Sequence, residues 1–413
     1  MVLEKLLGAS PDAAPPWLTI IGIGEDGIDA LSPVARRLIA GAELVVGGER
    51  HLTLAQSLIK GTRHAWPSPI EDAFPLILAQ RRRAVVVLAS GDPFHFGIGK
   101  QLAAIVPVRE ILCLPQPSAF SLAAARIGWP LQDVAAISLH GRNLHGIIRH
   151  LHPGARILAL SWDGSTPAQL ADLLTKRGLG ESRLTVLERM GGPHESAHHT
   201  TAERGFAVDI DALNTIAIEV AGDATAIPAF VPGLDDNLFV HDGQLTKREV
   251  RAITLSSLAP RHGELLWDIG LGAGSVAIEW LLADRSLKAI GIEERADRAS
   301  NAAHNAAALG TPELQIVTGR APQALAGLPA PDAVFVGGGL GDDVLAPAWS
   351  ALKTGGRMVA NAVTLEGEAT LLSAYQRFGG ELTRIELARA DRIGGLTGWR
   401  PAMPVTQWRA TKP

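Results

Sequence analysis

Two glycine-rich strings in the sequence have the composition of loops that hold a nucleotide-like ligand. The first, LTIIGIGEDG, places Gly22, Gly24 and Gly27 after an apolar run, in G-x-G-x-x-G spacing. Glu43 follows about 20 residues after the first glycines, where a dinucleotide-binding fold keeps its ribose-binding acid. The spacing therefore suggests, as a first hypothesis, an enzyme that transfers hydride with a nicotinamide dinucleotide.

The residues that follow this string argue against that hypothesis. A dinucleotide fingerprint requires its third glycine to open a helix, so that the helix N-terminus points at the pyrophosphate. Here Gly27 is followed by four more residues and then by Ser32-Pro33, a favoured N-cap and a favoured first helical residue. We expect the helix to begin near Ser32 and the glycines to form a loop of their own, which still suits a small molecule.

The second string, GELLWDIGLGAGSVAIEWL, has the spacing G-x-G-x-G at Gly270, Gly272 and Gly274. An apolar helical pattern starts immediately after Gly274, so loop and helix are expected to be in direct contact. Asp268 precedes the glycines, and Glu293 ends a later strand about 20 residues beyond Gly272, where a carboxylate can accept hydrogen bonds from both hydroxyls of a ribose. A dinucleotide fingerprint would have its third glycine one position later.

Strands and helices must alternate to position these loops. Short apolar, β-branched runs alternate with helical patterns along most of the chain, which is typical of strands buried on both faces in an α/β fold. The alternation breaks at 221–247, a stretch with two prolines, several Gly and Asp residues and no clear periodicity. We predict an α/β protein with domains at 1–220 and 241–413, joined by a linker at 221–240.

Composition narrows the classes of partner. The 413 residues are 47% hydrophobic and 19% charged, with a net charge of −4, which gives no electrostatic reason to expect nucleic acid or an anionic membrane. The single cysteine, Cys113, excludes an internal disulfide and fits a reducing compartment. Residues 1–17 lack the pattern of a signal peptide, and no apolar run is long enough for a membrane span. We predict a cytoplasmic protein.

Three further strings in the N-terminal half lie where strands are predicted to end: ASGDPFHFG, PQPSAFSLAAARIGWP and SLHGR. Together with GIGEDG they resemble the tetrapyrrole methylase family over about residues 17–220. The resemblance implies a fold in which S-adenosylmethionine (SAM) lies between the glycine loop and the G-D-P loop. The residues that it assigns to the cofactor are Gly22, Gly24, Asp92, Pro93, Ser118 and Ala119. His140 and Arg142 are candidate ligands for substrate carboxylates, although a solvated loop arginine is an equally good interpretation of Arg142.

The C-terminal half resembles the class I SAM-dependent methyltransferase fold, with a Rossmann-like sheet. The resemblance rests on GLGAG, on Glu293 at its spacing, and on VTGRAPQAL and DAVFVGGG; LTKREVRAITLSSLAP narrows it to the decarboxylating precorrin methyltransferase domain. In that family a threonine in the leading helix reaches the cofactor, and Thr246 matches it. The predicted cofactor-binding residues are Thr246, Gly270, Leu271, Gly272, Ala273, Gly274, Glu293, Arg320, Ala321 and Gly337.

The fusion of these two domains resembles a family of bifunctional enzymes of cobalamin biosynthesis. The resemblance implies a corrinoid precursor of the precorrin-6B type as substrate, methylation of its carbons 5 and 15, and loss of carbon dioxide from the ring C acetate to give precorrin-8. It assigns carbon 5 to the N-terminal domain, and carbon 15 with decarboxylation to the C-terminal domain. It also implies a homo-oligomer, with neighbouring enzymes of the pathway as further candidate partners.

Few acid–base residues are expected, because the conjugated macrocycle supplies the nucleophilic carbon and accepts the electrons that decarboxylation leaves behind. No metal site is predicted. Asn361 is a candidate hydrogen-bond donor and Glu366 a candidate acid–base group, although a solvated helix residue is the favoured interpretation of Glu366. RADRIGGLTGWRP is either a flexible loop beside the substrate or a hairpin. An NAD(P)-dependent oxidoreductase with two nucleotide-binding domains remains the alternative, and a tetrapyrrole-binding module with degenerate sites is a third class.

Overall fold

The computed structural model describes residues 16–223 and 227–413, which form two compact units. Unit 1 contains the described residues up to Arg142 and Pro153–Asp223, and unit 2 contains Asn143–His152 and the described residues from 227 onward. Residues 1–15, in the segment predicted to lack a signal peptide, and 224–226, in the predicted linker, lie outside the described residues. Within the described ranges, every helix is too short or too polar to cross a bilayer.

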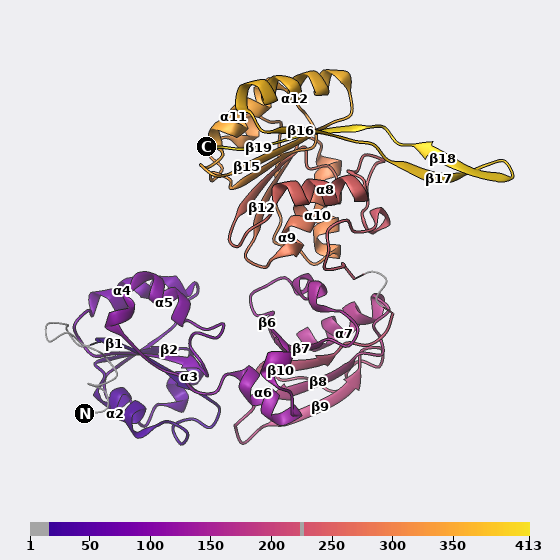
Figure 1. Cartoon of the computed structure of the whole chain (residues 1–413). Helices are drawn as coiled ribbons and strands as arrows, with labels where there is room; N and C mark the ends of the chain where they lie inside the picture. Colours follow the sequence, from indigo (N-terminus) through magenta and orange to yellow (C-terminus); the bar gives the residue numbers. More distant parts are fainter. Residues whose placement is uncertain (1–15, 224–226) are drawn as a thin grey trace. The chain divides into compact units, whose positions relative to one another are not determined.

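The first half of unit 1 is a five-stranded parallel sheet in the order β3-β2-β4-β1-β5. Helices α4 and α5 bury apolar side chains on one face, and α2 and α3 do so on the other (Figure 1). Both faces are therefore covered, which is why the predicted strands are continuous apolar runs. In chain order the elements are β1 (Leu18–Ile23), α2 (Pro33–Gly41), β2 (Leu44–Gly47), α3 (Glu49–Leu54), β3 (Thr62–Ala65), α4 (Phe74–Ala79), β4 (Val85–Ser90), α5 (Gly99–Ile105) and β5 (Ile111–Leu114).

Helix α2 begins where its capping residues predict. The Ser32 hydroxyl accepts a hydrogen bond from the Ala35 N–H at 3.2 Å, and Pro33 occupies the first helical position. Residues 28–32 therefore separate Gly27 from the helix. The expectation that the glycines form a loop of their own is confirmed for Gly24 and Gly27, whereas Gly22 lies in β1. The geometry of a dinucleotide fingerprint is absent here.

The second half of unit 1 is a mixed five-stranded sheet in the order β6-β7-β10-β8-β9. Only β6 and β7 run parallel; the other pairs are antiparallel. Helix α6 packs on this sheet through the fully buried Phe120. In chain order the elements are α6 (Ala119–Ile127), β6 (Ala135–Ser138), β7 (Arg156–Leu160), α7 (Thr166–Lys176), β8 (Arg183–Glu188), β9 (Ser196–Thr201) and β10 (Asn214–Glu219).

Unit 2 contains a seven-stranded sheet in the order β13-β12-β11-β14-β15-β19-β16, in which β19 runs antiparallel to both neighbours. One apolar core lies under α8, α9 and α10 and contains Trp280; the other lies under α11 and α12 and contains Trp408 (Figure 1). In chain order the elements are α8 (Arg248–Leu258), β11 (Leu265–Ile269), α9 (Ser275–Ala283), β12 (Lys288–Glu293), α10 (Ala296–Ala308), β13 (Gln315–Thr318), β14 (Ala333–Val336), α11 (Asp342–Ala351), β15 (Arg357–Ala362), α12 (Leu365–Phe378), β16 (Glu381–Ile385) and β19 (Val405–Thr411).

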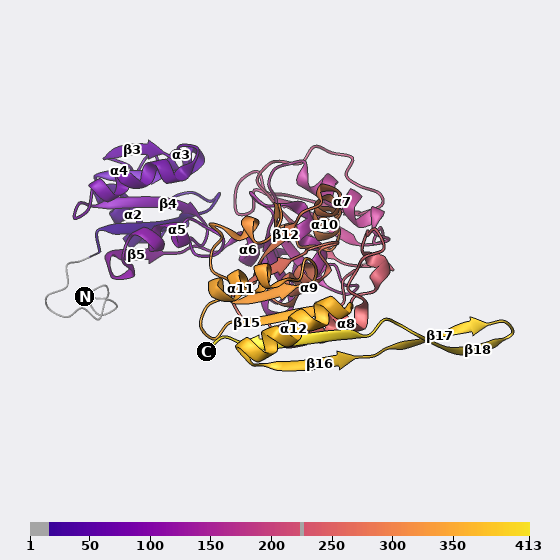
Figure 2. The same ribbon diagram turned by 90° about the horizontal axis from the view of Figure 1, so that it is seen from above.

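The Gly- and Arg-rich segment RADRIGGLTGWRP forms a hairpin. Its strands, β17 (Ala388–Ile393) and β18 (Leu396–Pro401), pair with each other in a separate two-stranded sheet. The hairpin extends away from the main sheet of unit 2 (Figure 2). Leu396 and Trp399 are 79% and 73% exposed on it. The hairpin interpretation of this segment is therefore confirmed.

Unit 2 also contains a short segment from within the N-terminal half of the chain. The 3-10 helix η4 (Leu144–His150) packs against the end of α10. The Arg149 guanidinium donates to the Gly310 carbonyl at 2.9 and 3.0 Å and pairs with Glu313 at 2.5 Å. No pattern in the sequence predicts this excursion, and the domain limits 1–220 and 241–413 stay a prediction.

Candidate cofactor and substrate sites

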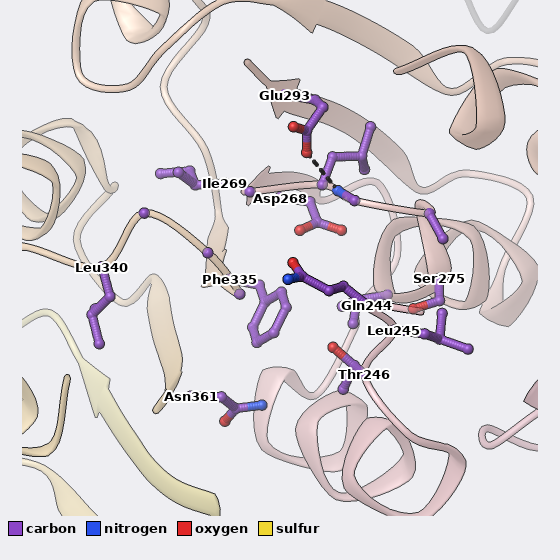
Figure 3. Close-up of a pocket in the computed structure, with 18 of the residues that line it drawn as sticks. Gln244, Leu245, Thr246, Asp268, Ile269, Ser275, Glu293, Phe335, Leu340 and Asn361 are labelled. Atoms are coloured by element: carbon purple, nitrogen blue, oxygen red, sulfur yellow. Dashed lines mark hydrogen bonds between the residues drawn. The ribbon is translucent and has the colours of Figure 1, made fainter. Parts of the chain in front are cut away.

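Unit 2 contains a cavity of about 1030 Å³ at the carboxyl ends of its parallel strands. The loops after β11, β12, β13 and β14 line it, together with the end of β15 and the segment that leads into α8 (Figure 3). In open α/β sheets this edge is where ligands bind. The cavity is large enough for a cofactor together with part of a substrate.

The glycine loop after β11 contacts the loop after β14 through main-chain atoms. Gly270 has φ +74°, and a Cβ atom there would lie 2.5 Å from the Gly338 nitrogen. Helix α9 starts at Ser275, directly after Gly274, as the sequence predicts. The absence of side chains at these glycines leaves backbone groups to form the cavity wall.

Glu293 ends β12 and is 5% exposed. Its two carboxylate oxygens accept hydrogen bonds from the Gly272 N–H at 2.8 Å, marked in Figure 3, and from the Arg295 N–H at 3.0 Å. Each oxygen keeps a further lone pair for a ligand hydroxyl. The structure thus brings together the acid and the glycine that the sequence spacing linked.

Asp268 is a buried carboxyl group in the wall of the same cavity. Its Oδ2 accepts a hydrogen bond from the Ala277 N–H at 3.0 Å, and its Oδ1 has no hydrogen-bond partner among the described residues. Burial, with a smaller contribution from the charge of Glu293, raises the pKa of Asp268 to about 8. The position of Asp268 before the glycines is visible in the sequence but predicts no role for it. An unpartnered buried oxygen beside a cavity is a group that a polar or cationic ligand would satisfy.

Most of the residues predicted for the C-terminal domain line the cavity. Those that do are Thr246, Gly270, Leu271, Gly272, Ala273, Glu293, Arg320, Ala321, Gly337 and Asn361. Gly274 does not; its left-handed conformation, φ +80°, precedes the first residue of α9. Thr246 lies two residues ahead of α8 rather than within a helix. Glu366 is exposed in the first turn of α12, outside the cavity lining, so the geometry gives it no contact with a ligand there.

Several residues that line the cavity were not predicted from the sequence. Phe335, Leu340 and Gln244 lie around the cavity in Figure 3. Phe335 belongs to the quoted string DAVFVGGG, but a strand buried on both faces gives no periodic signal for which side chain meets a ligand. Arg389, at the base of the hairpin, also lines the cavity and pairs with Glu249.

In unit 1 the loops after β1, β4 and β5 meet around Gly22. A Cβ atom at Gly22 would lie 1.8 Å from the Gly91 carbonyl oxygen and 2.7 Å from the Gln116 nitrogen. The Asp92 carboxylate accepts from the Phe94 N–H at 2.9 Å, as an Asx-type turn does, and the Ser118 hydroxyl caps α6. The structure therefore gathers the three predicted loops at one edge of the sheet, as the resemblance requires.

His140 and Arg142 follow β6 and are exposed. The Arg142 guanidinium lies 5.4 Å from the centre of the Phe96 ring, and the centre of the His140 ring lies 6.2 Å from that of Trp162. Phe96 belongs to the G-D-P loop. Arg142 therefore reaches a loop assigned to the cofactor, with a cation–π contact that leaves its N–H groups available.

Glu25, inside the first glycine string, is a further residue that was not predicted from the sequence. It pairs with Arg50, after β2, and with Arg189, after β8, the latter at 3.2 Å. Glu25 thus ties the glycine loop to the second sheet of unit 1. Nothing in the local sequence pattern marks such a pairing, because the three residues are far apart along the chain.

Glu43, in contrast, stands outside this region. It lies just ahead of β2, hence at the amino end of the strand, and pairs with Arg83 on the surface. A ribose-binding acid belongs at the carboxyl end of its strand. The structure therefore contradicts the initial dinucleotide hypothesis for unit 1 on the position of the acid as well as on the start of the helix.

Comparison with known proteins places this geometry in a class. Residues 17–204 match the family model of tetrapyrrole (corrin/porphyrin) methylases, and residues 237–412 match that of a precorrin methyltransferase domain. The chain is thus a tetrapyrrole methylase fused to a precorrin methyltransferase domain. A precorrin-6Y C(5,15)-methyltransferase [decarboxylating] of a Sinorhizobium species is 56% identical over 412 residues, which are 99% of this chain and 100% of the relative. The chain belongs to the family of decarboxylating precorrin-6Y C(5,15)-methyltransferases.

Shorter relatives match less than half of the chain. A cobalt-precorrin-7 C(5)-methyltransferase of Salmonella typhimurium is 30% identical over 44% of this chain and 89% of its own length. A probable cobalt-precorrin-6B C(15)-methyltransferase (decarboxylating) of Saccharolobus solfataricus is 32% identical over 44% of this chain and 97% of its own length. The expected two-domain α/β fold and methyltransferase class are confirmed, and the oxidoreductase alternative receives no support.

Proposed function

We propose that this chain methylates carbons 5 and 15 of a precorrin-6B-type macrocycle and removes carbon dioxide from its ring C acetate, giving precorrin-8. The observation that supports this most directly is the cavity of unit 2, where Glu293, Asp268 and the glycine loop meet. A full-length relative with the corresponding name supports the same activity.

The two reactions are divided between the two halves of the chain. The N-terminal domain methylates carbon 5, and the C-terminal domain decarboxylates and methylates carbon 15. Two observations support this division. Each half has its own glycine loop with a position that excludes any side chain, Gly22 or Gly270. The two half-length relatives bear names with a single methylated carbon each.

The methyl donor is SAM, and the residues of unit 2 fit it. When bound, SAM supplies an electrophilic methyl group on a positively charged sulfur. Glu293 accepts hydrogen bonds from the ribose hydroxyls, and the glycine loop lets the ligand approach the main chain. The unpartnered Oδ1 of Asp268 offers a negative or polar partner to the cationic end of the ligand. Arg320 and Ala321 flank the adenine, and Thr246 and Gly337 complete the wall. In unit 1 the corresponding residues are Gly22, Gly24, Asp92, Pro93, Ser118 and Ala119.

The chain's own residues act mainly by positioning. Methyl transfer requires the nucleophilic carbon, the methyl group and the leaving sulfur to be in line, and it proceeds best where water is excluded. Phe335, Leu340 and Val363 supply apolar walls to the cavity, while Arg389 supplies a cation for substrate carboxylates. His140 and Arg142 serve the same purpose in unit 1. Asn361 donates a hydrogen bond to the substrate. For Glu366, the candidate acid–base role rests on its position in the sequence alone.

Location and assembly form part of the same proposal. The chain acts in the cytoplasm as a homo-oligomer, alongside other enzymes that handle corrinoid precursors. Its single cysteine, half-buried in β5, fits a reducing compartment. The β17–β18 hairpin supports an oligomer, because an isolated two-stranded hairpin with exposed Leu396 and Trp399 is only marginally stable in water. Light scattering after size exclusion measures the assembly.

The test of function is an incubation of the full chain with precorrin-6B and SAM that carries a labelled methyl group. Mass spectrometry is expected to show two added labelled methyl groups and the loss of one carbon dioxide. Parallel titration with NADH is expected to give no binding heat. A product with an unchanged carbon skeleton, together with NADH binding, would overturn the proposal in favour of an oxidoreductase.

A further inference from the structure

A closed cluster of uncharged polar side chains lies behind the cavity wall of unit 2. Thr254 on α8 and Gln407 on β19 are 0% and 2% exposed. Asn361, near the end of β15, is half-buried and lines the cavity, and it pairs directly with Gln407 across the β15–β19 ladder. Three elements therefore bring one cavity residue and two buried residues together.

The distances within this cluster indicate which groups donate and which accept. The Thr254 hydroxyl lies 2.8 Å from the Val250 carbonyl oxygen, which can only accept, so the hydroxyl proton is directed there. The Thr254 oxygen is then left as an acceptor. The two groups that approach it, from Asn361 at 3.0 Å and from Gln407 at 3.1 Å, must both be amide N–H donors.

The same logic fixes the orientation of each amide. The second N–H of Gln407 donates to the Asn361 Oδ1 at 2.9 Å, and the Gln407 Oε1 accepts from the Ser257 hydroxyl at 2.7 Å. Gln407 thus uses both of its N–H groups inside the cluster. Asn361 uses one N–H and one carbonyl lone pair there, so one N–H and one lone pair remain for a ligand.

We propose that Gln407 and Thr254 are positioning residues that hold the Asn361 amide in one orientation for the reaction in this cavity. The ligand class is a carboxylate side chain of the macrocycle, because the remaining Asn361 N–H is a donor with a fixed direction. An amide turned by 180° would present its carbonyl oxygen in place of that N–H and repel the carboxylate. This inference rests on the proposed decarboxylating methyltransferase activity of unit 2.

Isosteric substitutions separate orientation from packing. Gln407→Glu keeps the shape but removes both N–H donors, so the Asn361 amide is expected to turn its own N–H toward residue 407. Thr254→Val keeps the volume and removes the acceptor, while Thr254→Ser retains the hydroxyl as the matched control. Ser257→Ala is a second control, because it leaves both partners of Asn361 in place.

The kinetic expectation follows from the geometry. Gln407→Glu and Thr254→Val are expected to lower kcat for decarboxylation and carbon 15 methylation by about 10²-fold, the scale associated with misplacing a group near the reacting atoms. In Thr254→Ser and Ser257→Ala, kcat is expected to stay within about threefold of the wild-type value, because both hydrogen-bond partners of Asn361 are retained. Calorimetric SAM binding and the thermal midpoint, measured on every variant, show that the cavity remains folded.

A spectroscopic measurement tests the orientation of the Asn361 amide independently of the reaction that the cavity catalyses. Crystallography at ordinary resolution does not distinguish the oxygen and nitrogen of an amide. Selective ¹⁵N-asparagine labelling of the full chain does, with the Asn361 side-chain signal assigned by its loss in Asn361→Asp. In wild type one of the two amide protons is expected to be protected from exchange, and in Gln407→Glu the shifts of the pair are expected to change.

The outcomes separate this inference from the proposed function. Wild-type kcat in both Gln407→Glu and Thr254→Val, or an Asn361 amide with no protected proton in wild type, would overturn the positioning role. Failure of the wild-type chain to convert precorrin-6B, with the protected amide still present, would overturn the proposed function and confirm the cluster. Loss of activity in Thr254→Ser as large as in Thr254→Val would also count against the role of the hydroxyl.

Discussion

The two glycine loops of this chain look alike in sequence and differ in structure. Both lie at the end of a buried strand, and each has a glycine at which a Cβ atom would meet neighbouring backbone: Gly22, near the end of β1, and Gly270, directly after β11. In unit 1 the next helix begins only at Pro33, whereas in unit 2 it begins at Ser275, directly after the loop. The position of the N-cap, Ser32 in unit 1 and the third glycine Gly274 in unit 2, therefore decides whether the helix starts directly after the glycines.

The acids that follow the two loops differ in the same way. Glu293 ends its strand and bonds the main chain of the glycine loop, while Glu43 precedes its strand and pairs with Arg83 on the surface. Both acids follow their glycines by about 20 residues, yet Glu293 lies at the carboxyl end of its strand and Glu43 at the amino end. Substitutions at these glycines and acids test whether each loop is a binding site and whether Glu293, but not Glu43, belongs to one.

Gly22→Ala is expected to have the largest effect. The added methyl group would overlap the Gly91 carbonyl at 1.8 Å, so the loops after β1 and β4 must separate. We expect a loss of about 3 kcal/mol in the free energy of unfolding of unit 1, the upper end of the range for overpacking. Urea unfolding measures it. Gly41→Ala is the control, since no described atom beyond its chain neighbours and the backbone of its own helix lies within 4 Å of its Cβ position. An unchanged Gly22→Ala protein would show that the loops are not in contact.

Gly270→Ala is expected to abolish binding in unit 2 and spare unit 1. The substitution combines φ +74° with a clash against Gly338 at 2.5 Å. Gly355→Ala is the matched control, because φ is +75° there and no described atom beyond its chain neighbours lies within 4 Å of the Cβ position. The control should lose only about 1 kcal/mol of stability from backbone strain. Calorimetric titration of the full chain with SAM should show two bound molecules per chain in wild type and one in Gly270→Ala. A stoichiometry of two in Gly270→Ala would contradict the placement of the site in unit 2.

Glu293→Gln sharpens the contrast between the acids. Removal of the charge weakens the bonds to Gly272 and to the ligand hydroxyls, and a hydrogen bond to a charged group contributes about 1.5–3 kcal/mol. SAM affinity of the unit 2 site should fall by about 10- to 100-fold, following the same energies. Glu43→Gln is the control in unit 1 and should leave both affinities unchanged. Weakened SAM binding in Glu43→Gln would contradict the placement of Glu43 on the surface, away from the first glycine loop.

Sequence patterns anticipated those features that depend on local geometry. Ser32-Pro33 located the start of α2, and Gly274 located the start of α9, because caps and glycines act within a few residues. Thr254 and Gln407 could not be found in this way, since an antiparallel strand and a helix far apart in sequence bring them to Asn361. The η4 segment in unit 2 is a similar case: Arg149 meets the end of α10 only through tertiary packing, which leaves no periodic trace in the sequence.

Asp268→Asn provides the smallest and most specific test. Unit 1 places its strand-end carboxylate, Asp92, in a turn, whereas unit 2 buries Asp268, and burial raises the pKa of Asp268 from 3.8 to about 8. Between these values the folded state holds a proton that the unfolded state has released, so stability decreases as pH rises. Between pH 6 and 7 the wild type should lose about 1 kcal/mol of unfolding free energy relative to Asp268→Asn. Urea unfolding at both pH values measures this difference.

If the free energy of unfolding changed with pH equally in the two proteins, Asp268 would be ionised throughout this range. Its unpartnered oxygen would then face a cationic ligand without any release of a proton on binding.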